Sequence, residues 1–134
     1  MTRNIFLESC NDLGHHIGEN FSNNSLIIVD EALDKLNLHT LSDLQTKYFK
    51  VSEDTKNLNA IEAIWDIMFS SNLNRSSEVI IIGGGVLLDL AAFAASTFKR
   101  GISFTLIPST LLAMVDASHG GKNGFNNNYG KNQI

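Results

Sequence analysis

Residues 78–89 of the sequence, EVIIIGGGVLLD, combine an apolar strand pattern, three consecutive glycines and the start of a helix pattern. Glycines at such a junction let the backbone approach a phosphate, and the N–H groups and dipole of the new helix favour its negative charge. A tight turn between a strand and a helix, with no ligand, is the alternative interpretation. The G-x-G-x-x-G fingerprint of dinucleotide-binding dehydrogenases is incomplete, because Leu88 stands where its third glycine would be. The pattern therefore indicates nucleotide binding rather than a standard dehydrogenase.

Asp89 and the segment 107–132 add groups that suit an anionic or sugar-containing ligand. Asp89 falls near the first turn of the expected helix, where a carboxylate either stabilises the helix dipole or accepts a hydrogen bond from a ribose hydroxyl. The segment IPSTLLAMVDASHGGKNGFNNNYGKN holds Asp116, Lys122 and Lys131. Its Gly-Gly-Lys sequence offers an open backbone and a positive charge for phosphate or carboxylate. A surface loop without a ligand is the alternative here.

The hydrophobic pattern predicts the elements that must position these residues. Compact apolar runs predict strands at residues 5–8, 25–30, 48–51, 78–82 and 103–107. Helices are expected at residues 31–36, 57–71 and 86–98, with a further one starting within 109–117. In the second of these, Asn57 is the expected N-cap, and the expected core residues include Trp65, Met68 and Phe69. Strands that alternate with helices indicate an α/β fold with a parallel sheet covered on both faces.

Composition and charge restrict the class of protein. The chain has 134 residues, 43% of them hydrophobic and 18% charged, which fits one globular domain with a core. Its net charge of −4 argues against a nucleic-acid surface, which needs clustered Lys and Arg. No apolar run reaches the roughly 18 residues of a membrane span, and the start lacks a signal-peptide pattern. With Cys10 as the single cysteine, we expect a cytoplasmic protein without a nucleic-acid or membrane partner.

From residue 83 to residue 132 the sequence resembles the dehydroquinate synthase family of sugar-phosphate cyclases. In that family a GGGVxxD turn precedes a helix of small residues, an RG turn, a strand, P-[ST]-T-LL, VD-[AS]-S, GGK, an Asn-rich loop and GKN. All of these occur here in the same order. Upstream, residues 52–56 (SEDTK) are similar to the family's G-E-x-x-K segment, with Ser52 in place of glycine. The resemblance implies a Rossmann-like parallel sheet with helices on both faces, and an amino-terminal NAD-binding domain over residues 1–134.

The resemblance also implies roles for individual residues. Glu53 and Lys56 would hold the adenosine end of NAD, the glycine turn would pass over the pyrophosphate, and Asp89 would contact a ribose. The expected cofactor-binding residues are Glu53, Lys56, Gly84, Gly85, Val86, Leu87, Leu88, Asp89, Ser109, Thr110, Lys122 and Lys131. The expected catalytic residues are Asp116 and Lys122, between nicotinamide and substrate, and Asn132, at the substrate phosphate.

The activity implied by the resemblance is that of a lyase in the shikimate pathway to aromatic amino acids. Such enzymes use NAD and a divalent metal, zinc or cobalt, to convert 3-deoxy-D-arabino-heptulosonate 7-phosphate into 3-dehydroquinate and phosphate. The resemblance further implies a small sugar-phosphate substrate and a homodimer. The family's metal ligands, one Glu and two His, follow the GKN motif. We therefore expect no metal ligand in these residues, a missing metal-binding second domain, and no turnover by this chain alone.

Departures from the family pattern leave the exact substrate open. Leu88 replaces a small residue, His119 stands between VDAS and GGK, and Asn123 replaces a threonine. A cyclase for another sugar phosphate, a related polyol dehydrogenase and a nucleotide-binding module without catalysis are the alternatives. The four histidines lack zinc-ligand spacing, and the adjacent pair His15 and His16 is expected in a polar, solvated turn.

Overall fold

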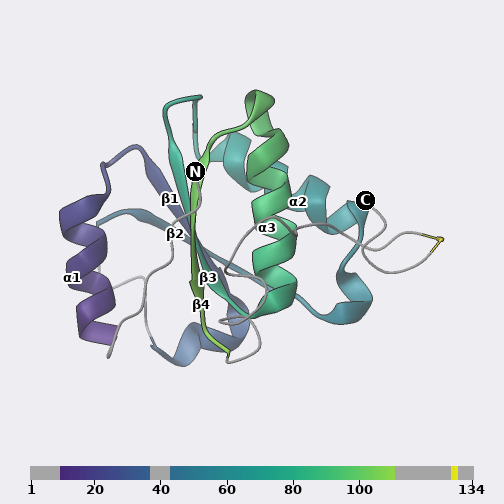
Figure 1. The fold of residues 1–134 in the computed structure, drawn as a ribbon, viewed down its shortest axis with the longest axis horizontal. Helices are drawn as coiled ribbons and strands as arrows, with labels where there is room; N and C mark the ends of the chain where they lie inside the picture. Colours follow the sequence, from purple (N-terminus) through teal and green to yellow (C-terminus); the bar gives the residue numbers. More distant parts are fainter. Residues whose placement is uncertain (1–9, 37–42, 111–127, 130–134) are drawn as a thin grey trace.

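The structure is a computed structural model and describes residues 10–36, 43–110 and 128–129. Its elements, in chain order, are α1 (Cys10–Asn20), β1 (Ser25–Asp30), the 3-10 helix η1 (Glu31–Leu36), β2 (Gln45–Phe49), η3 (Glu53–Thr55), α2 (Leu58–Ser70), β3 (Glu78–Gly83), α3 (Gly85–Thr97), η4 (Phe98–Arg100) and β4 (Ser103–Pro108) (Figure 1). The strand expected at residues 5–8 lies outside the described residues, as does most of the helix expected within 109–117.

The described strands form one parallel sheet in the order β2-β1-β3-β4. The chain runs from β1 to β2 on one side and then crosses to β3 on the other side of β1. The strand order therefore reverses between β1 and β3. In open parallel sheets, the crevice outside the carboxyl ends of the strands at such a reversal is where ligands bind.

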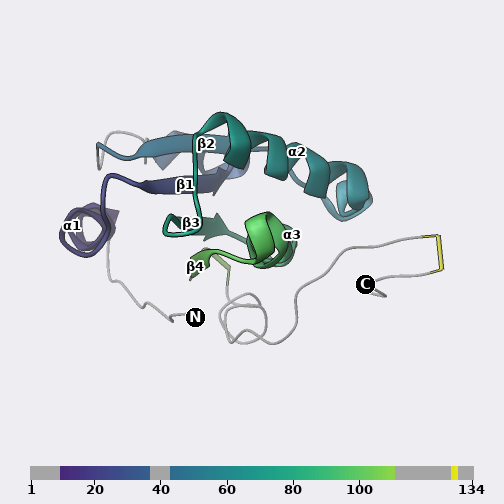
Figure 2. The ribbon, with the colours of Figure 1, turned by 90° about the horizontal axis from the view of Figure 1, so that it is seen from above.

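Alternate residues of the central strands pack into two separate cores. Leu26, Ile28, Val79 and Ile81 belong to the core shared with α2 and α3. Their neighbours Ile27, Val29, Ile80 and Ile82 belong to the core under α1. Figure 2 shows α1 on one face of the sheet and α2 and α3 on the other. The predicted parallel sheet with helices on both faces is confirmed, and it explains why β1 and β3 are apolar at successive positions.

The distribution of the connections over the two faces follows the right-handed crossover rule. The β2–β3 and β3–β4 connections move across the sheet in the same direction, and their helices α2 and α3 lie on the same face. The β1–β2 connection moves in the opposite direction, and its residue Leu33 packs on the α1 face. Right-handed crossovers require this change of face when the direction changes.

The helices α2 and α3 pack against each other beside the sheet. Asn57 caps α2 as predicted, since its Oδ1 accepts a hydrogen bond from the Ala60 N–H at 3.2 Å. The Trp65 indole N–H donates to the Ala94 carbonyl of α3 at 3.1 Å, and Met68 is fully buried. The expectation for Phe69 was wrong, because its side chain is 58% exposed. Its ring lies against that of Phe98, 4.6 Å away between centroids, rather than entering the core.

Two further expectations need correction. His15 and His16 lie in the helix α1, not in a polar turn, because Leu13 and Ile17 are one helical turn apart and both pack on the sheet. The third strand occupies Gln45–Phe49 rather than residues 48–51. It lies at one end of the strand order and pairs only with β1 in the described sheet, so polar residues such as Gln45 and Lys47 are tolerated and no apolar run marks its start. In the described part of the chain, no helix has the length and apolarity needed to span a membrane.

Candidate nucleotide-binding site

The glycine turn lies at the carboxyl end of β3, beside the reversal of strand order. Gly83 ends β3, Gly84 is the N-cap residue of α3, and the helix begins at Gly85. Gly84 has extended backbone angles and, as a glycine, has no side chain that could cap the helix. The first N–H groups of a helix have no partner within it. The amino terminus of α3 therefore presents backbone donors and the positive end of its dipole at the ligand edge of the sheet.

Two glycines of the turn, Gly83 and Gly85, have different surroundings. A Cβ atom on Gly83 would lie 2.9 Å from Leu87 Cδ2 and 3.1 Å from Asp30 Cβ, so β1, β3 and α3 pack closely only because it is absent. A Cβ atom on Gly85 would have no neighbour within 4 Å among the described residues. Neither residue has a positive φ angle. Packing thus explains Gly83, whereas Gly85 leaves open space beside the helix terminus.

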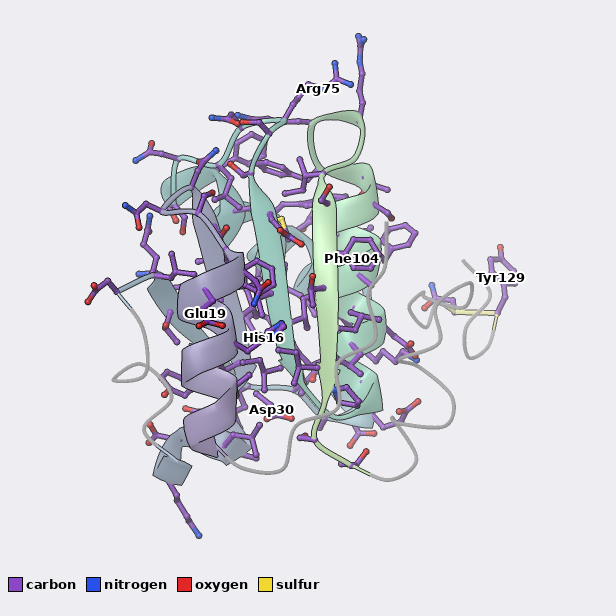
Figure 3. The ribbon with its side chains drawn as sticks, turned by 60° about the vertical axis from the view of Figure 1, so that its left-hand side comes forward. His16, Glu19, Asp30, Arg75, Phe104 and Tyr129 are labelled. Carbon is purple, nitrogen blue, oxygen red and sulfur yellow. The ribbon has the colours of Figure 1, made fainter. Side chains whose placement is uncertain are left out.

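Residues from two neighbouring strands complete this edge. The Ser109 N–H, just after β4, donates to the Gly83 carbonyl at 2.8 Å, and the Thr110 side chain lies next to Gly84. Asp30 ends β1, and its Oδ1 accepts from the Ala32 N–H at 3.0 Å. Figure 3 shows Asp30 at the end of the sheet opposite to Arg75. Asp30 was not among the expected site residues, although an acidic residue closing an apolar run was a visible signal.

The structure pairs two residues that the sequence assigned to separate parts of the ligand. Lys56 follows η3 and Asp89 lies near the start of α3, and Lys56 Nζ is 2.7 Å from Asp89 Oδ2. The Lys56 side chain is 4% exposed and that of Asp89 is 20% exposed. This ion pair joins the segment after β2 to the helix after the glycine turn. Both expected site residues therefore lie near the carboxyl ends of the strands.

The remaining expected site residues divide into three groups. Glu53 is exposed at the start of η3, and Ser52 before it has an extended backbone with φ −150°, so no glycine is required there. Leu87 and Leu88 are buried in the core, which leaves only their backbone for a ligand, while Val86 is partly buried. The expected site residues outside the described part of the chain are Asp116, Lys122, Lys131 and Asn132. The departures His119 and Asn123 lie outside it as well.

In residues 10–36, 43–110 and 128–129, no three or more His, Cys, Asp or Glu side chains are grouped so that they could hold a metal ion. The described residues therefore do not form a divalent-metal site by themselves.

The parallel sheet, the helices on both of its faces and the glycine turn at the strand-order reversal define a Rossmann-like α/β domain. Residues 46–134 match the model of the family described as 3-dehydroquinate synthase N-terminal. Since this match covers more than half of the chain, the chain belongs to that family.

Individual relatives agree with the family match. The 3-dehydroquinate synthase of Campylobacter curvus (strain 525.92) is 49% identical over 114 residues, which are 81% of this chain and 33% of that protein. A solved structure of ValA, a 2-epi-5-epi-valiolone synthase from Streptomyces hygroscopicus subsp. jinggangensis 5008 with NAD⁺ and Zn²⁺ bound, is 28% identical. Its TM-score is 0.77 over 83% of this chain and 34% of that chain. A 2-deoxy-scyllo-inosose synthase shares the fold at 23% identity, with a TM-score of 0.78 over 93% of this chain and 38% of that one. The chain thus spans about a third of the length of the proteins it matches.

Proposed function

We propose that this chain is the NAD-binding half of a 3-dehydroquinate synthase, which converts 3-deoxy-D-arabino-heptulosonate 7-phosphate into 3-dehydroquinate and phosphate. The observation that carries the proposal is the open glycine turn at the amino terminus of α3, placed where the strand order reverses. The identity of 49% to a curated 3-dehydroquinate synthase, against 28% to a valiolone-type cyclase, favours this substrate over that of the other cyclase.

In this proposal the pyrophosphate of NAD rests on the N–H groups that follow Gly84, in the space beside Gly85. Asp89 accepts a hydrogen bond from a ribose hydroxyl, and Glu53, exposed beyond β2, lies on the adenosine side. Ser109 and Thr110 lie toward the nicotinamide. The proposed residues around the substrate, beyond the described part of the chain, are Asp116, Lys122 and Asn132, with Lys131 on the cofactor.

NAD, when bound, supplies reversible oxidation of a substrate hydroxyl, while the protein supplies orientation and charge. The structure of the related ValA with NAD⁺ and Zn²⁺ supports NAD as the cofactor here, and a divalent metal in the complete enzyme. We further propose that residues 1–134 act as the NAD-binding domain beside a separate metal-binding domain, within a cytoplasmic homodimer.

Calorimetric titration with NAD tests the cofactor assignment directly. We expect this chain to bind NAD, with an affinity weakened because part of the substrate-side surface is not contributed by it. No heat of binding at millimolar NAD would contradict the proposal. We also expect no phosphate release from the heptulosonate phosphate by this chain, and zinc-dependent release would contradict that expectation.

Replacing Gly85 by alanine should separate ligand binding from stability. The new methyl group meets no described atom within 4 Å, so we expect unfolding stability to be unchanged or raised by about 0.5–1 kcal/mol. The same methyl group projects into the space proposed for the pyrophosphate. We therefore expect the NAD affinity to fall by at least about tenfold, because the phosphate is held away from the helix N–H groups.

Gly18→Ala is the matched control for that substitution. Gly18 lies in α1, is exposed, and a Cβ atom there would also meet nothing within 4 Å. We expect a gain of about 1 kcal/mol in stability from the higher helix propensity of alanine, with no change in NAD affinity. Unchanged NAD binding in Gly85→Ala, or an equal loss in Gly18→Ala, would show that the ligand does not lie on the glycine turn.

A further inference from the structure

We propose that Lys56 is a positioning residue that orients the Asp89 carboxylate for the cofactor, rather than a group that binds the cofactor itself. The inference rests on the proposed NAD site. It assigns to Lys56 a role different from the direct contact that the sequence resemblance implies.

Burial is the first observation behind this assignment. The Lys56 side chain is 4% exposed, so almost none of its surface is available to a ligand. Its ammonium lies 2.7 Å from Asp89 Oδ2, a distance typical of a strong charge-assisted hydrogen bond. Asp89 is 20% exposed and is the member of the pair with more surface toward solvent. A ligand at this edge of the sheet therefore has better access to the carboxylate than to the ammonium.

The local backbone holds Lys56 in place independently of any ligand. The Lys56 N–H donates to the Glu53 carbonyl at 3.3 Å, and the Asn57 N–H donates to the Thr55 carbonyl at 2.9 Å. Asn57 then caps α2, which packs on α3. The lysine is thus anchored between η3 and α2 while its charge reaches α3, so it fixes the orientation of a carboxylate near the start of that helix.

A carboxylate accepts a ribose hydroxyl best when its rotamer is fixed before the ligand arrives, because less conformational entropy is then lost on binding. Lys56 supplies this fixation through its charged hydrogen bond. Removing the ammonium should weaken NAD binding only as far as Asp89 takes part in it. Once Asp89 has been neutralised, Lys56 should contribute little more to the affinity.

A double-mutant cycle on NAD affinity tests this inference. Calorimetry would compare the unchanged chain with Lys56→Met, Asp89→Asn and the double variant. We expect each single change to weaken NAD binding by about tenfold, the range for losing one charged hydrogen bond. We expect the double variant to be within about threefold of the weaker single variant, because the two residues act as one unit. Losses that multiply to about a hundredfold would overturn the inference and assign Lys56 its own contact with NAD.

Controls separate this outcome from other causes. Lys99→Met removes another ammonium that donates a hydrogen bond at 2.7 Å, to the Leu73 carbonyl near the opposite edge of the sheet. It should lower thermal stability without changing NAD affinity. If Lys56→Met does not fold, Lys56→Gln takes its place. Because its amide can still donate to Asp89, we then expect a smaller loss of NAD affinity than Asp89→Asn causes, and a double variant within about threefold of Asp89→Asn. Failure of the unchanged chain to bind NAD would refute the proposed function, whereas additive losses in a chain that binds NAD refute only this inference.

Discussion

Replacing Phe98 by alanine should lower the free energy of unfolding by about 3–5 kcal/mol, the usual cost of removing a buried aromatic side chain. Phe98 is 2% exposed and belongs to the core formed by the sheet with α2 and α3. Its ring lies 4.6 Å from that of Phe69 between centroids, at an interplanar angle of 57°. The Lys99 ammonium lies 5.4 Å from the Phe98 centroid. The substitution therefore removes core packing, an aromatic pair and a cation–π contact together.

Phe69→Ala is the matched control, because it removes the other ring of the same pair from a side chain that is 58% exposed. We expect a loss of about 1 kcal/mol, the contribution of an aromatic pair without much burial. Urea unfolding of both variants, followed by circular dichroism, would measure the difference. Equal losses in the two variants would mean that Phe69 carries core packing, as the helical spacing of its sequence had suggested.

Lys56→Met should be the second strongly destabilising substitution. Breaking a buried ion pair by removing one partner typically costs about 3–5 kcal/mol, since the remaining charge is left without its partner. Asp89 is 20% exposed and keeps some contact with water, so we expect a value near about 3 kcal/mol. Urea unfolding is the measurement.

The double variant Lys56→Met/Asp89→Leu should recover most of that loss, because two apolar side chains can replace a buried pair with little net cost. For Asp89→Asn alone, which leaves the lysine buried, we expect a loss of stability between those of the double variant and Lys56→Met. A double variant at least as unstable as Lys56→Met would contradict this account. It would show that the side chains hold the segment after β2 by packing or by other contacts, rather than by their mutual charge.

The sequence determined the elements that depend only on their own residues. The strands β1 and β3 contain continuous apolar runs, because parallel strands are buried on both faces. The helix α3 was predicted within one residue at each end, since its small and apolar side chains allow it to be buried nearly all round. The glycine turn and the N-cap Asn57 were equally local signals, and the motif series from GGGVLLD to GKN led to the family that the comparison confirmed.

Tertiary structure decided the features that depend on distant partners. The strand β2 has a mixed polar sequence and becomes a strand because it pairs with β1. The helix α1 is fixed by two residues that reach the sheet. Phe69 and Met68 are adjacent apolar residues, but Met68 is buried in the core that α2 forms with the sheet and α3, whereas Phe69 is 58% exposed.

The same division holds for the site. The sequence indicated the three-glycine turn, Lys56 and Asp89, but could not distinguish a glycine required by packing from one that leaves space for a ligand. Nor could it show that Lys56 and Asp89, 33 residues apart, form one ion pair. A residue's type and its near neighbours determine its local conformation. Burial and charge pairing depend on the crossover connections that place η3, α2 and α3 beside one another. These connections are a property of the whole fold.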